Sequence, residues 1–264
     1  MLEIRHVSKT FNPGTVNEKK ALSDINLTLE DGDFVTVVGG NGAGKSTLLN
    51  MIAGVYPIDC GHIVLDNKDI STEPEFKRAH MIGRVFQDPL MGTAGDMAIY
   101  ENLAMANRRG RKRTLRWGVR PEEMEQFKEQ LKRLGLGLEE RLTAKVGLLS
   151  GGQRQALTLL MASLIKPKLL LLDEHTAALD PLTARKVLDL TNEIVNEENL
   201  TTLMITHNMK DAIRIGNRLI MMYDGKIILD VRGEEKKKLT VEDLHRKFRE
   251  VANEEFTDDR GVLI

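Results

Sequence analysis

The amino-acid sequence predicts an α/β fold with a parallel sheet core, an N-terminal antiparallel β-subdomain and an inserted α-helical subdomain. Short apolar runs alternate with segments of helical period through most of the chain, which favours parallel strands joined by helices. Residues 2–11, 21–30 and 61–69 instead alternate between apolar and polar side chains, as strands with one exposed face do. Residues 88–149 are helical in period and hold no convincing strand, so they form the insert.

The composition limits both the size of the fold and its partners. The chain has 264 residues, 41% of them hydrophobic, which is enough for one large domain or two small ones with a proper core. Its 38 basic residues nearly balance 39 acidic ones, so a globally basic nucleic-acid binder is not indicated. Cys60 is the only cysteine, which excludes an internal disulfide and fits a reducing compartment.

The sequence shows no sign of export or of membrane insertion. Its N-terminal residues lack the basic-then-apolar order of a signal peptide. The longest apolar stretches, residues 156–165 and 169–172, are far short of the roughly 20 residues that cross a bilayer. We therefore expect a soluble cytoplasmic protein, and if it works at a membrane, other chains must span that membrane.

A glycine-rich stretch follows a buried strand expected over 34–38 and precedes residues 47–52, where a helix is expected to start. It fits the pattern G-x-x-x-x-G-K-[ST], which cradles nucleotide phosphates between a strand and a helix. Glycines let successive backbone N–H groups point at anionic oxygens, and the helix N-terminus adds the positive end of a dipole. Lys45 would reach the β- and γ-phosphates, and the Ser46 hydroxyl would ligate Mg²⁺. The alternative, a glycine turn with an exposed lysine, is disfavoured by the strand–helix context. The stretch consists of Gly39, Gly40, Asn41, Gly42, Ala43, Gly44, Lys45, Ser46 and Thr47.

The predicted insert contains one well-marked helix. Pro121 suits its first position and Gly135 a stop. A single apolar face recurs between them at intervals of three, four and three residues, formed by Met124, Phe127, Leu131 and Leu134.

A basic run, residues 108–113, lies in the same insert. Most such runs are solvated faces, which is the favoured interpretation. Contact with anionic lipid headgroups is the next alternative. Nucleic acid is the least favoured, because the total charge is balanced.

Residues 149–153, Leu-Ser-Gly-Gly-Gln, precede an apolar-faced helix expected over 154–165. Ser150 and Gln153 have the spacing of a capping box, so an ordinary helix start is one interpretation. The same atoms would also form an anion site, because Gly151 and Gly152 place no side chain over the free N–H groups of the helix end. The chain then has two phosphate-binding helix ends. Two copies arranged head to tail would each lend the second end to the other's nucleotide.

Two carboxylates, those of Asp173 and Glu174, follow residues 168–172 at the end of an expected apolar strand. An acid at the carboxyl end of a buried parallel strand points into the crevice where α/β sheets bind ligands. Asp173 could hold Mg²⁺ directly or through water. Glu174 could take a proton from an attacking water. A strand end that merely reaches solvent is the alternative, and the neighbouring phosphate loop disfavours it.

Three further positions are singled out by their place in the predicted fold. His207 follows another parallel strand and so shares an edge with the phosphate loop, whereas His175 is expected to be a structural neighbour of Glu174. Gln87 joins the core to the insert, where it could sense nucleotide, although a surface amide is the alternative. Asp180 before Pro181 suits a helix N-cap, with a role at a dimer interface as a possible addition.

The C-terminal part begins with a strand over 226–231. A highly charged linker is expected over 232–238. Thr240 and Asp243 resemble a capping box for a short helix that ends at about residue 251. The last dozen residues are expected to be poorly ordered.

Taken in this order, the motifs resemble those of the nucleotide-binding subunit of an ATP-binding cassette (ABC) transporter over roughly residues 2–231. The phosphate loop corresponds to 39–47, the signature to 149–153, the second acidic motif to 169–174 and the D-loop to 178–180, with Gln87 in the Q-loop and His207 as the switch histidine. The signature between the Q-loop and the acidic strand makes this resemblance specific. One departure is Met161, where many members have an arginine, which bears on packing rather than on phosphate contacts.

The resemblance implies a P-loop NTPase (RecA-like) core that binds ATP and Mg²⁺ and hydrolyses ATP to drive transport. Phe11 takes the place of the aromatic residue that stacks on adenine, and residues 150–153 of a partner copy would close over the γ-phosphate. The catalytic residues would be Glu174, His207, Gln87 and Lys45. The metal ligands would be Ser46, Gln87 and Asp173. The phosphate-contacting residues of the signature would be Ser150, Gly151, Gly152 and Gln153.

The resemblance also implies an organisation and a set of partners. Residues 1–231 form the ATPase domain, with a core and β-subdomain over 1–87 and 150–231 and the helical insert over 88–149, and 232–264 form the extension. The partners are a second ATPase subunit in a homodimer, transmembrane permease subunits and, indirectly, a solute-binding protein, with no nucleic acid. The protein would lie on the inner face of the cell membrane.

The sequence of residues 146–162 resembles that of the ATPases of a bacterial subgroup of uptake systems. This resemblance implies amino acids, and aromatic ones in particular, as cargo. An exporter ATPase is one alternative, because nothing in these residues fixes the direction of transport. A soluble ABC ATPase that acts on nucleic acid or ribosomes is another, disfavoured by the single cassette and by an insert too short for a coiled-coil arm.

Overall fold

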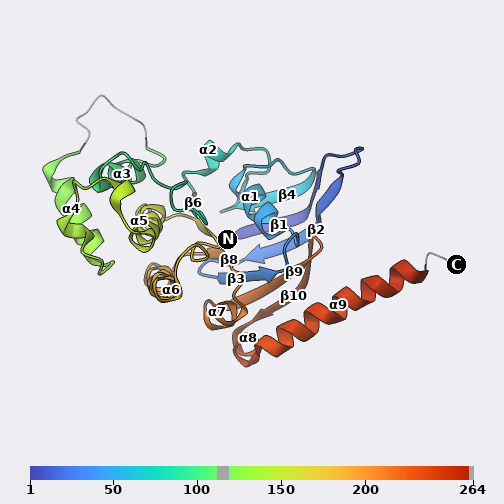
Figure 1. Cartoon of the computed structure of the whole chain (residues 1–264). Coiled ribbons are helices and arrows are strands. Elements are labelled where there is room, and N and C mark those ends of the chain that lie inside the picture. The colour runs from blue at the N-terminus through green and yellow to red at the C-terminus, as the bar shows by residue number, and fades with distance from the viewer. Residues whose placement is uncertain (112–118, 262–264) are drawn as a thin grey trace.

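The computed structural model describes residues 1–111 and 119–261, over which the chain forms two sheets with flanking helices (Figure 1). The strands are β1 (Leu2–Phe11), β2 (Lys19–Leu29), β3 (Phe34–Gly39), β4 (Cys60–Leu65), β5 (Lys68–Asp69), β6 (Ile82–Val85), β7 (Leu169–Asp173), β8 (Thr202–Ile205), β9 (Arg218–Tyr223) and β10 (Lys226–Arg232). The helices are α1 (Lys45–Ala53), α2 (Glu75–Arg78), α3 (Ile99–Asn107), α4 (Pro121–Lys132), α5 (Gly151–Ser163), α6 (Pro181–Glu197), α7 (Met209–Arg214), α8 (Gly233–Lys238) and α9 (Val241–Gly261), with 3₁₀ turns η1 (Leu138–Glu140) and η2 (Val146–Leu148).

The first sheet is antiparallel and has the order β2-β1-β4-β5. It confirms the predicted N-terminal β-subdomain. The single strand expected over 61–69 is a hairpin instead, because the chain turns at Asp66 and Asn67 with φ of 52° and 62°. Aspartate and asparagine tolerate this left-handed conformation, which two-residue hairpin turns require.

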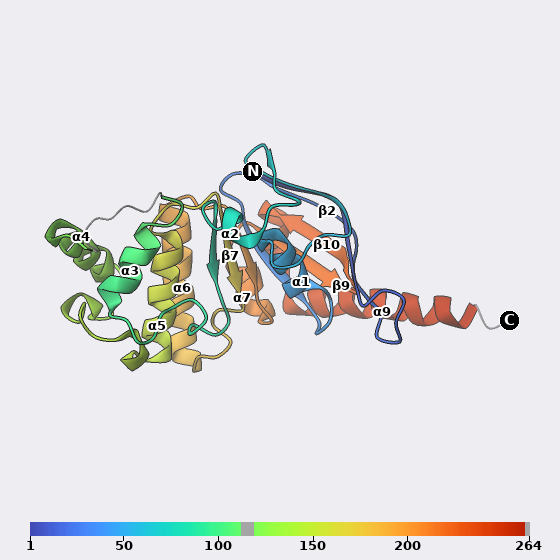
Figure 2. The same ribbon diagram turned by 90° about the horizontal axis from the view of Figure 1, so that it is seen from above.

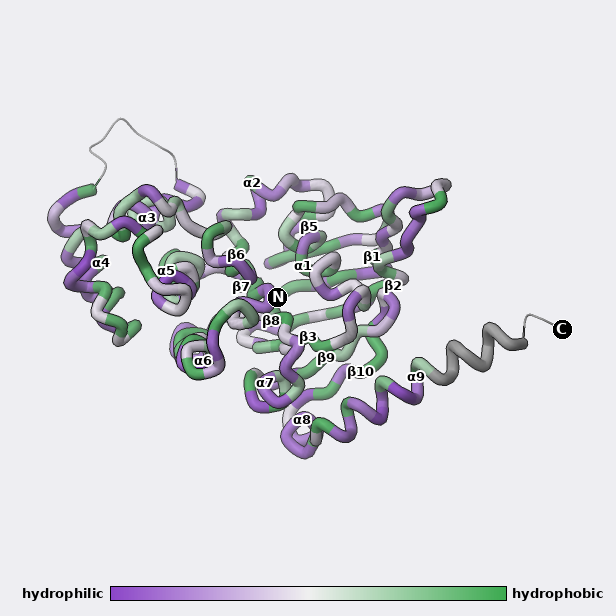
Figure 3. Tube along the Cα trace, viewed as in Figure 1, coloured by the Kyte–Doolittle hydropathy of each residue, from purple (hydrophilic) through white to green (hydrophobic). Residues whose placement is uncertain are grey.

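The second sheet has the order β10-β9-β3-β8-β7-β6. Strands β9, β3, β8, β7 and β6 run parallel, and only β10 is antiparallel to its neighbour. The strands of this sheet are largely hydrophobic (Figure 3), and all four leucines of β7 are fully buried, as parallel strands covered on both faces require. Since these strands run the same way, the residues that follow β3, β6, β7 and β8 gather at one edge of the sheet.

Helices α3, α4, α5 and α6 lie together on one side of the molecule (Figures 1 and 2). The predicted apolar face of α4 is confirmed: Phe127 and Leu131 are buried, and Leu134 is 7% exposed just beyond the helix end. They belong to the same core cluster as Leu157 of α5 and Leu170 of β7. The insert therefore packs onto the parallel sheet through α5 rather than forming a separate core.

The basic run of the insert was expected to be a solvated face, which is wrong for two of its arginines. Arg108 pairs with Glu123 of α4 at 3.1 Å. Arg109 donates hydrogen bonds to two carbonyl oxygens near the C-terminal end of α5, at 3.0 and 2.6 Å. Cations at this position satisfy carbonyl groups that a helix end leaves unpaired. Lys112 and Arg113 lie outside the described residues.

The charged segment expected as a linker forms a helix, α8, which is docked onto the body of the protein. Lys236 is only 2% exposed, and its ammonium group donates to the carbonyl oxygens of Ile215 and Gly216 after α7. Burial lowers the pKa of this lysine to about 8. Within this segment of mixed charges, nothing in the sequence indicates that one lysine is buried.

Helix α9 begins with the predicted capping box. Thr240 accepts a hydrogen bond from the Asp243 backbone, and the Asp243 carboxylate accepts one from the Thr240 N–H. The helix continues to Gly261, well past the expected end near residue 251, because no glycine or proline interrupts it (Figure 2). Within the described residues, no helix is both long and apolar enough to cross a membrane.

Candidate functional site

The glycine-rich loop connects β3 to α1, as predicted, although α1 begins at Lys45 rather than at Thr47. Gly42 and Gly44 have φ of 82° and 94°, a left-handed backbone that favours glycine. A Cβ on Gly44 would also lie 2.5 Å from the Ala21 carbonyl oxygen of β2. The loop therefore needs glycine for its conformation and for its close approach to the antiparallel sheet.

Lys45 is folded back over this loop. Its ammonium group donates to the carbonyl oxygens of Gly39 and Gly40, at 2.8 and 2.9 Å. Burial lowers its pKa, while the nearby carboxylates of Glu174 and Asp173 act in the opposite direction. Since an ammonium group has three donors, one remains for an anion in front of the loop.

A cavity of about 350 Å³ lies against the loop. It is lined by segments that are far apart in the sequence, namely Phe11, Lys19, Ala21, the loop residues 41–47, Glu174 and His207. Phe11 packs edge-on against Tyr56, with ring centroids 5.3 Å apart. A partly buried aromatic ring, a cradle of N–H groups and a pair of titratable side chains thus meet in one cavity, an arrangement suited to a nucleotide.

Sequence reasoning missed Lys19 and Ala21 in the cavity wall. Lys19 pairs with Phe11 across the β1–β2 ladder, because β2 begins at Lys19, two residues before the expected start of that strand. The Lys19 ammonium group lies 3.4 Å from the point that a Cβ on Gly42 would occupy. It adds a second cation to the side of the cavity that faces the loop.

Glu174 and His207 lie at the cavity, where β7 and β8 end side by side. The parallel register pairs Asp173 with Ile205, so both side chains leave the sheet at the same edge. His207 Nδ1 is 2.9 Å from Glu174 Oε1, and the glutamate side chain is only 13% exposed. Glu174 has a φ of 46°, an unfavourable conformation for a residue with a Cβ. Such strain is commonly found at functional sites.

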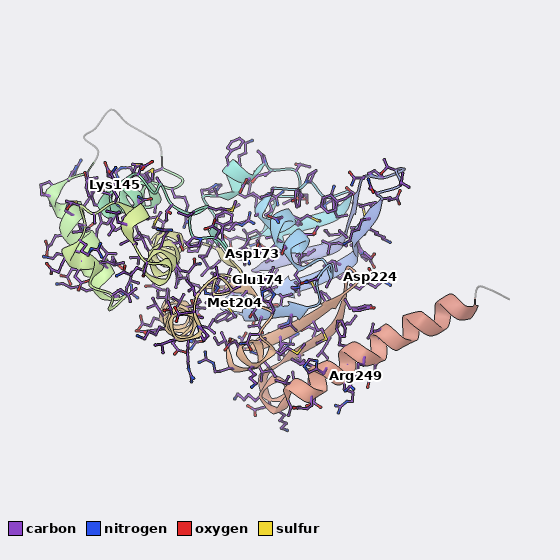
Figure 4. All side chains as sticks on the ribbon, in the orientation of Figure 1. Lys145, Asp173, Glu174, Met204, Asp224 and Arg249 are labelled. Atoms are coloured by element: carbon purple, nitrogen blue, oxygen red, sulfur yellow. The ribbon has the colours of Figure 1, made fainter. Side chains whose placement is uncertain are left out.

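Asp173 is the last residue of β7, next to Glu174, which lines the cavity (Figure 4). Burial raises the pKa of its carboxyl group, and the positive charges of Arg84, Lys45 and His207 partly offset this effect. Together with the Ser46 hydroxyl, it offers the oxygen ligands that Mg²⁺ takes from proteins when it binds through one or two side chains, phosphates and water. The residues present therefore fit Mg²⁺.

Arg84 is a second residue of this region that sequence reasoning missed. Its guanidinium group donates to Asn50 Oδ1 of α1 at 2.6 Å and lies 3.9 Å from Asp173 Oδ2. It also stacks over the ring of Phe86, 4.4 Å from the centroid. The signal was available, because Arg84 is the one charged residue of the otherwise apolar strand β6.

The second predicted anion site lies at the N-terminus of α5. The capping box is confirmed: Ser150 Oγ accepts from the Gln153 N–H at 3.3 Å, and the Gln153 side chain accepts from the Ser150 N–H. Gly152 has an additional reason to be glycine, because a Cβ there would lie 2.2 Å from Thr183 Cγ2 of α6. In the described residues, α5 contributes nothing to the wall of the cavity. The structure thus leaves this helix end apart from the phosphate loop of its own chain.

Gln87 follows β6, is exposed and does not line the cavity. The structure therefore places Gln87 at the same sheet edge as the other predicted site residues but not in the cavity wall. His175 is buried and hydrogen-bonded to Thr191 at 2.9 Å, and burial lowers its pKa to about 4, in keeping with the structural role expected for it. Asp180 caps α6 by accepting from the Thr183 N–H.

A parallel sheet whose glycine-rich loop, acidic strand end and helix N-terminus are arranged in this way defines a P-loop ATP-binding cassette. Residues 22–177, more than half of the chain, match the ABC transporter family, and the chain belongs to that family. It is the ATP-hydrolysing subunit of an ABC transporter.

Relatives in sequence support this assignment over most of the chain. A tyrosine transport ATP-binding protein of Clostridioides difficile is 46% identical over 249 residues, which cover 94% of this chain and 98% of that protein. A xylose/arabinose import ATP-binding protein of Sulfolobus acidocaldarius is 36% identical, with 89% of each chain covered. A spermidine/putrescine import ATP-binding protein of Haemophilus influenzae is 32% identical over 87% of this chain, but only 57% of that longer protein is covered.

Solved structures of cassettes have the same fold. The ADP conformation of MJ1267, an ATP-binding cassette of an ABC transporter, matches with a TM-score of 0.75 and 30% identity, covering 90% of this chain and 93% of that one. A dimeric, post-hydrolysis structure of the cassette MJ0796 with ADP and phosphate matches with a TM-score of 0.74 and 28% identity, covering 88% and 98%. Both support a P-loop core that holds nucleotide.

Proposed function

We propose that the chain powers uptake of an aromatic amino acid, as one of two ATPase subunits bound to a permease on the cytoplasmic face of a membrane and served by a solute-binding protein. The supporting observation is the 46% identity with a tyrosine transport ATP-binding protein over 98% of its length. The division into a core with β-subdomain (1–87 and 150–231), an insert (88–149) and an extension (232–264) belongs to this proposal.

The chemistry proposed for the site starts from Glu174 and His207. Glu174 Oε1 accepts a proton from a water, whose oxygen attacks the γ-phosphorus while the bond to the ADP oxygen breaks. His207, 2.9 Å from the same carboxylate, orients it and contacts the γ-phosphate. Lys45 donates its remaining N–H to the phosphates, and the backbone of residues 41–44 holds them. Ser46 and Asp173 would hold Mg²⁺, which neutralises phosphate charge.

Two chains are needed in this proposal because the site within one chain is incomplete. Ser150 is exposed at the N-terminus of α5, and that helix end does not reach the cavity of its own chain. In a head-to-tail pair, the α5 end of each copy would close over the γ-phosphate bound by the other. The dimeric structure of the related cassette with ADP and phosphate supports a pair of cassettes. Gln87 reaches the site only after such a closure.

The experiment that tests the proposal is ATP hydrolysis by the co-purified transporter in lipid vesicles. ATPase activity should be stimulated by tyrosine with its solute-binding protein, and Ser150→Arg should abolish turnover while leaving ATP binding to the isolated chain intact. Stimulation by a polyamine or a pentose instead of tyrosine would contradict the cargo, and full activity of a Ser150→Arg protein would contradict the shared site.

The permease is proposed to dock beside Gln87, on the segment of residues 91–103. The structure selects the position for a cross-linking cysteine: Asp96 is exposed, whereas Ala98 is only 9% exposed. An Asp96→Cys variant, made together with Cys60→Ser, should cross-link to a membrane chain. A matched cysteine at exposed Glu193 on α6 serves as the control. No cross-link in any nucleotide state would contradict this docking face.

A further inference from the structure

The C-terminal extension lies beside the phosphate loop. Phe248 of α9 faces Gly40: its Cζ is 3.5 Å from the point that a Cβ on Gly40 would occupy, so the ring limits the space next to this glycine. Its ring also packs edge-on against Tyr223, with centroids 5.3 Å apart at 83°. Tyr223 is the last residue of β9, which pairs with β3 as far as Gly39. The ring therefore lies next to the loop without lining the cavity.

The carbonyl groups of Gly39 and Gly40 bind the ammonium group of Lys45. The Gly40 carbonyl oxygen accepts a hydrogen bond from Lys45 Nζ at 2.9 Å, and that of Gly39 accepts one at 2.8 Å. Phe248 thus lies next to the peptide whose carbonyl oxygen binds the cation that faces the phosphates. A shift of the Gly40 peptide would move the ammonium group, because the two are hydrogen-bonded.

Helix α9 is fixed independently of Phe248. One turn earlier, Leu244 is fully buried in a cluster with Val38 and Met221. The capping box at Thr240 and the buried Lys236 of α8 hold the segment before it. Figure 4 labels the sequence neighbours of the two rings. Asp224 follows Tyr223, Arg249 follows Phe248, and both labels lie on the same side of the molecule. The base of the helix can therefore place the ring rigidly against the loop.

We propose that Phe248 is a positioning residue for nucleotide binding: its ring holds the Gly40 peptide so that Lys45 is oriented toward the phosphates. The extension after residue 232 then sets the affinity for ATP although none of its described side chains lines the cavity. This inference depends on ATP binding by the single chain, and not on the proposed cargo, permease or shared site.

The test compares ATP binding by full-length Phe248→Ala, Phe248→Tyr and wild-type protein, using isothermal titration calorimetry. Losing the ring should raise the Kd for ATP about fivefold, and Phe248→Tyr should restore it, because aromatic contacts of this kind change free energies by about 1 kcal/mol. KM should rise by the same factor while kcat at saturating ATP stays unchanged, the pattern of lost uniform binding.

Two controls separate positioning from a loss of stability. Leu131→Ala removes a buried side chain of α4, in a different core cluster from Phe248, so it should lower Tm and leave the Kd for ATP unchanged. Arg249→Ala, an exposed neighbour of Phe248, should change neither. If Phe248→Ala lowers Tm but leaves the Kd within twofold of the wild type, the inference is wrong. If that variant does not fold, Phe248→Leu serves for the same comparison, because it keeps apolar bulk but lacks the ring.

Discussion

The carboxylate of Glu174 and the imidazole of His207 lie 2.9 Å apart at the ends of two neighbouring parallel strands. The two residues are far apart in the sequence, because the whole of α6 lies between β7 and β8. The parallel pairing of these two strands brings the two residues together. The contact gives the proposed base a fixed orientation toward the cavity. It also makes the two residues a unit whose contributions are not expected to add.

Glu174→Gln should lower the ATPase rate by about 10²- to 10⁴-fold while ATP binding is retained, because the amide cannot accept the proton. His207→Ala should lower it by a similar order, and the double variant by little more than either single one. Steady-state hydrolysis and calorimetric Kd values measure these effects. Glu193→Gln, an exposed glutamate on α6, is the control and should be silent. Near-normal hydrolysis by Glu174→Gln would remove this residue from the proposed role.

Gly152→Ala should destabilise the fold by about 1–3 kcal/mol, because its Cβ would collide with Thr183 Cγ2. Thr183→Ser removes that methyl group and keeps the backbone N–H that Asp180 caps, so the double variant should regain most of the stability. Urea unfolding of the four proteins measures this coupling. If packing is the only role of Gly152, the double variant should recover its ATPase activity together with its stability. If the double variant is stable but inactive, Gly152 is also required at the phosphates, as the shared site predicts.

Short sequence patterns predicted those parts of the site that are formed by consecutive residues. The glycine loop, the Ser150 cap and the carboxylates after β7 each depend on a few consecutive residues and were found from them. Contacts between distant segments could not be found in this way: nothing near Phe248 indicates Gly40, and Arg84 meets Asp173 only through the pairing of β6 with β7. The charged segment 233–238 was misjudged because its one buried lysine depends on carbonyl groups after α7.

Arg84→Met should have opposite effects on the metal-free fold and on metal binding. Without Arg84, Asn50 loses a hydrogen bond, and the partly buried Asp173 carboxylate loses a neighbouring positive charge. The free energy of unfolding should therefore fall by about 1–3 kcal/mol. The same loss removes a positive charge 3.9 Å from a proposed metal ligand, so Mn²⁺ should bind more tightly in the presence of ATP. Electron paramagnetic resonance of Mn²⁺ measures this affinity. Arg84→Lys keeps the charge and should leave Mn²⁺ binding nearly unchanged; tighter binding by that variant as well would refute the electrostatic explanation.

The stability contributed around Lys236 should increase with pH between about 8 and 10.5. Burial lowers the pKa of this lysine from 10.5 to about 8 in the folded protein. Between these values the unfolded chain binds a proton that the folded chain does not, so a rise in pH favours the folded state, and below pH 8 the full cost of burying the charge remains. The free energy of unfolding relative to Lys236→Met, measured with urea at several pH values, should therefore rise across this window. Lys238→Met, an exposed lysine on the same helix, should show no such slope against the wild type. A flat difference for Lys236→Met would mean that the two carbonyl oxygens keep the ammonium group charged despite its burial.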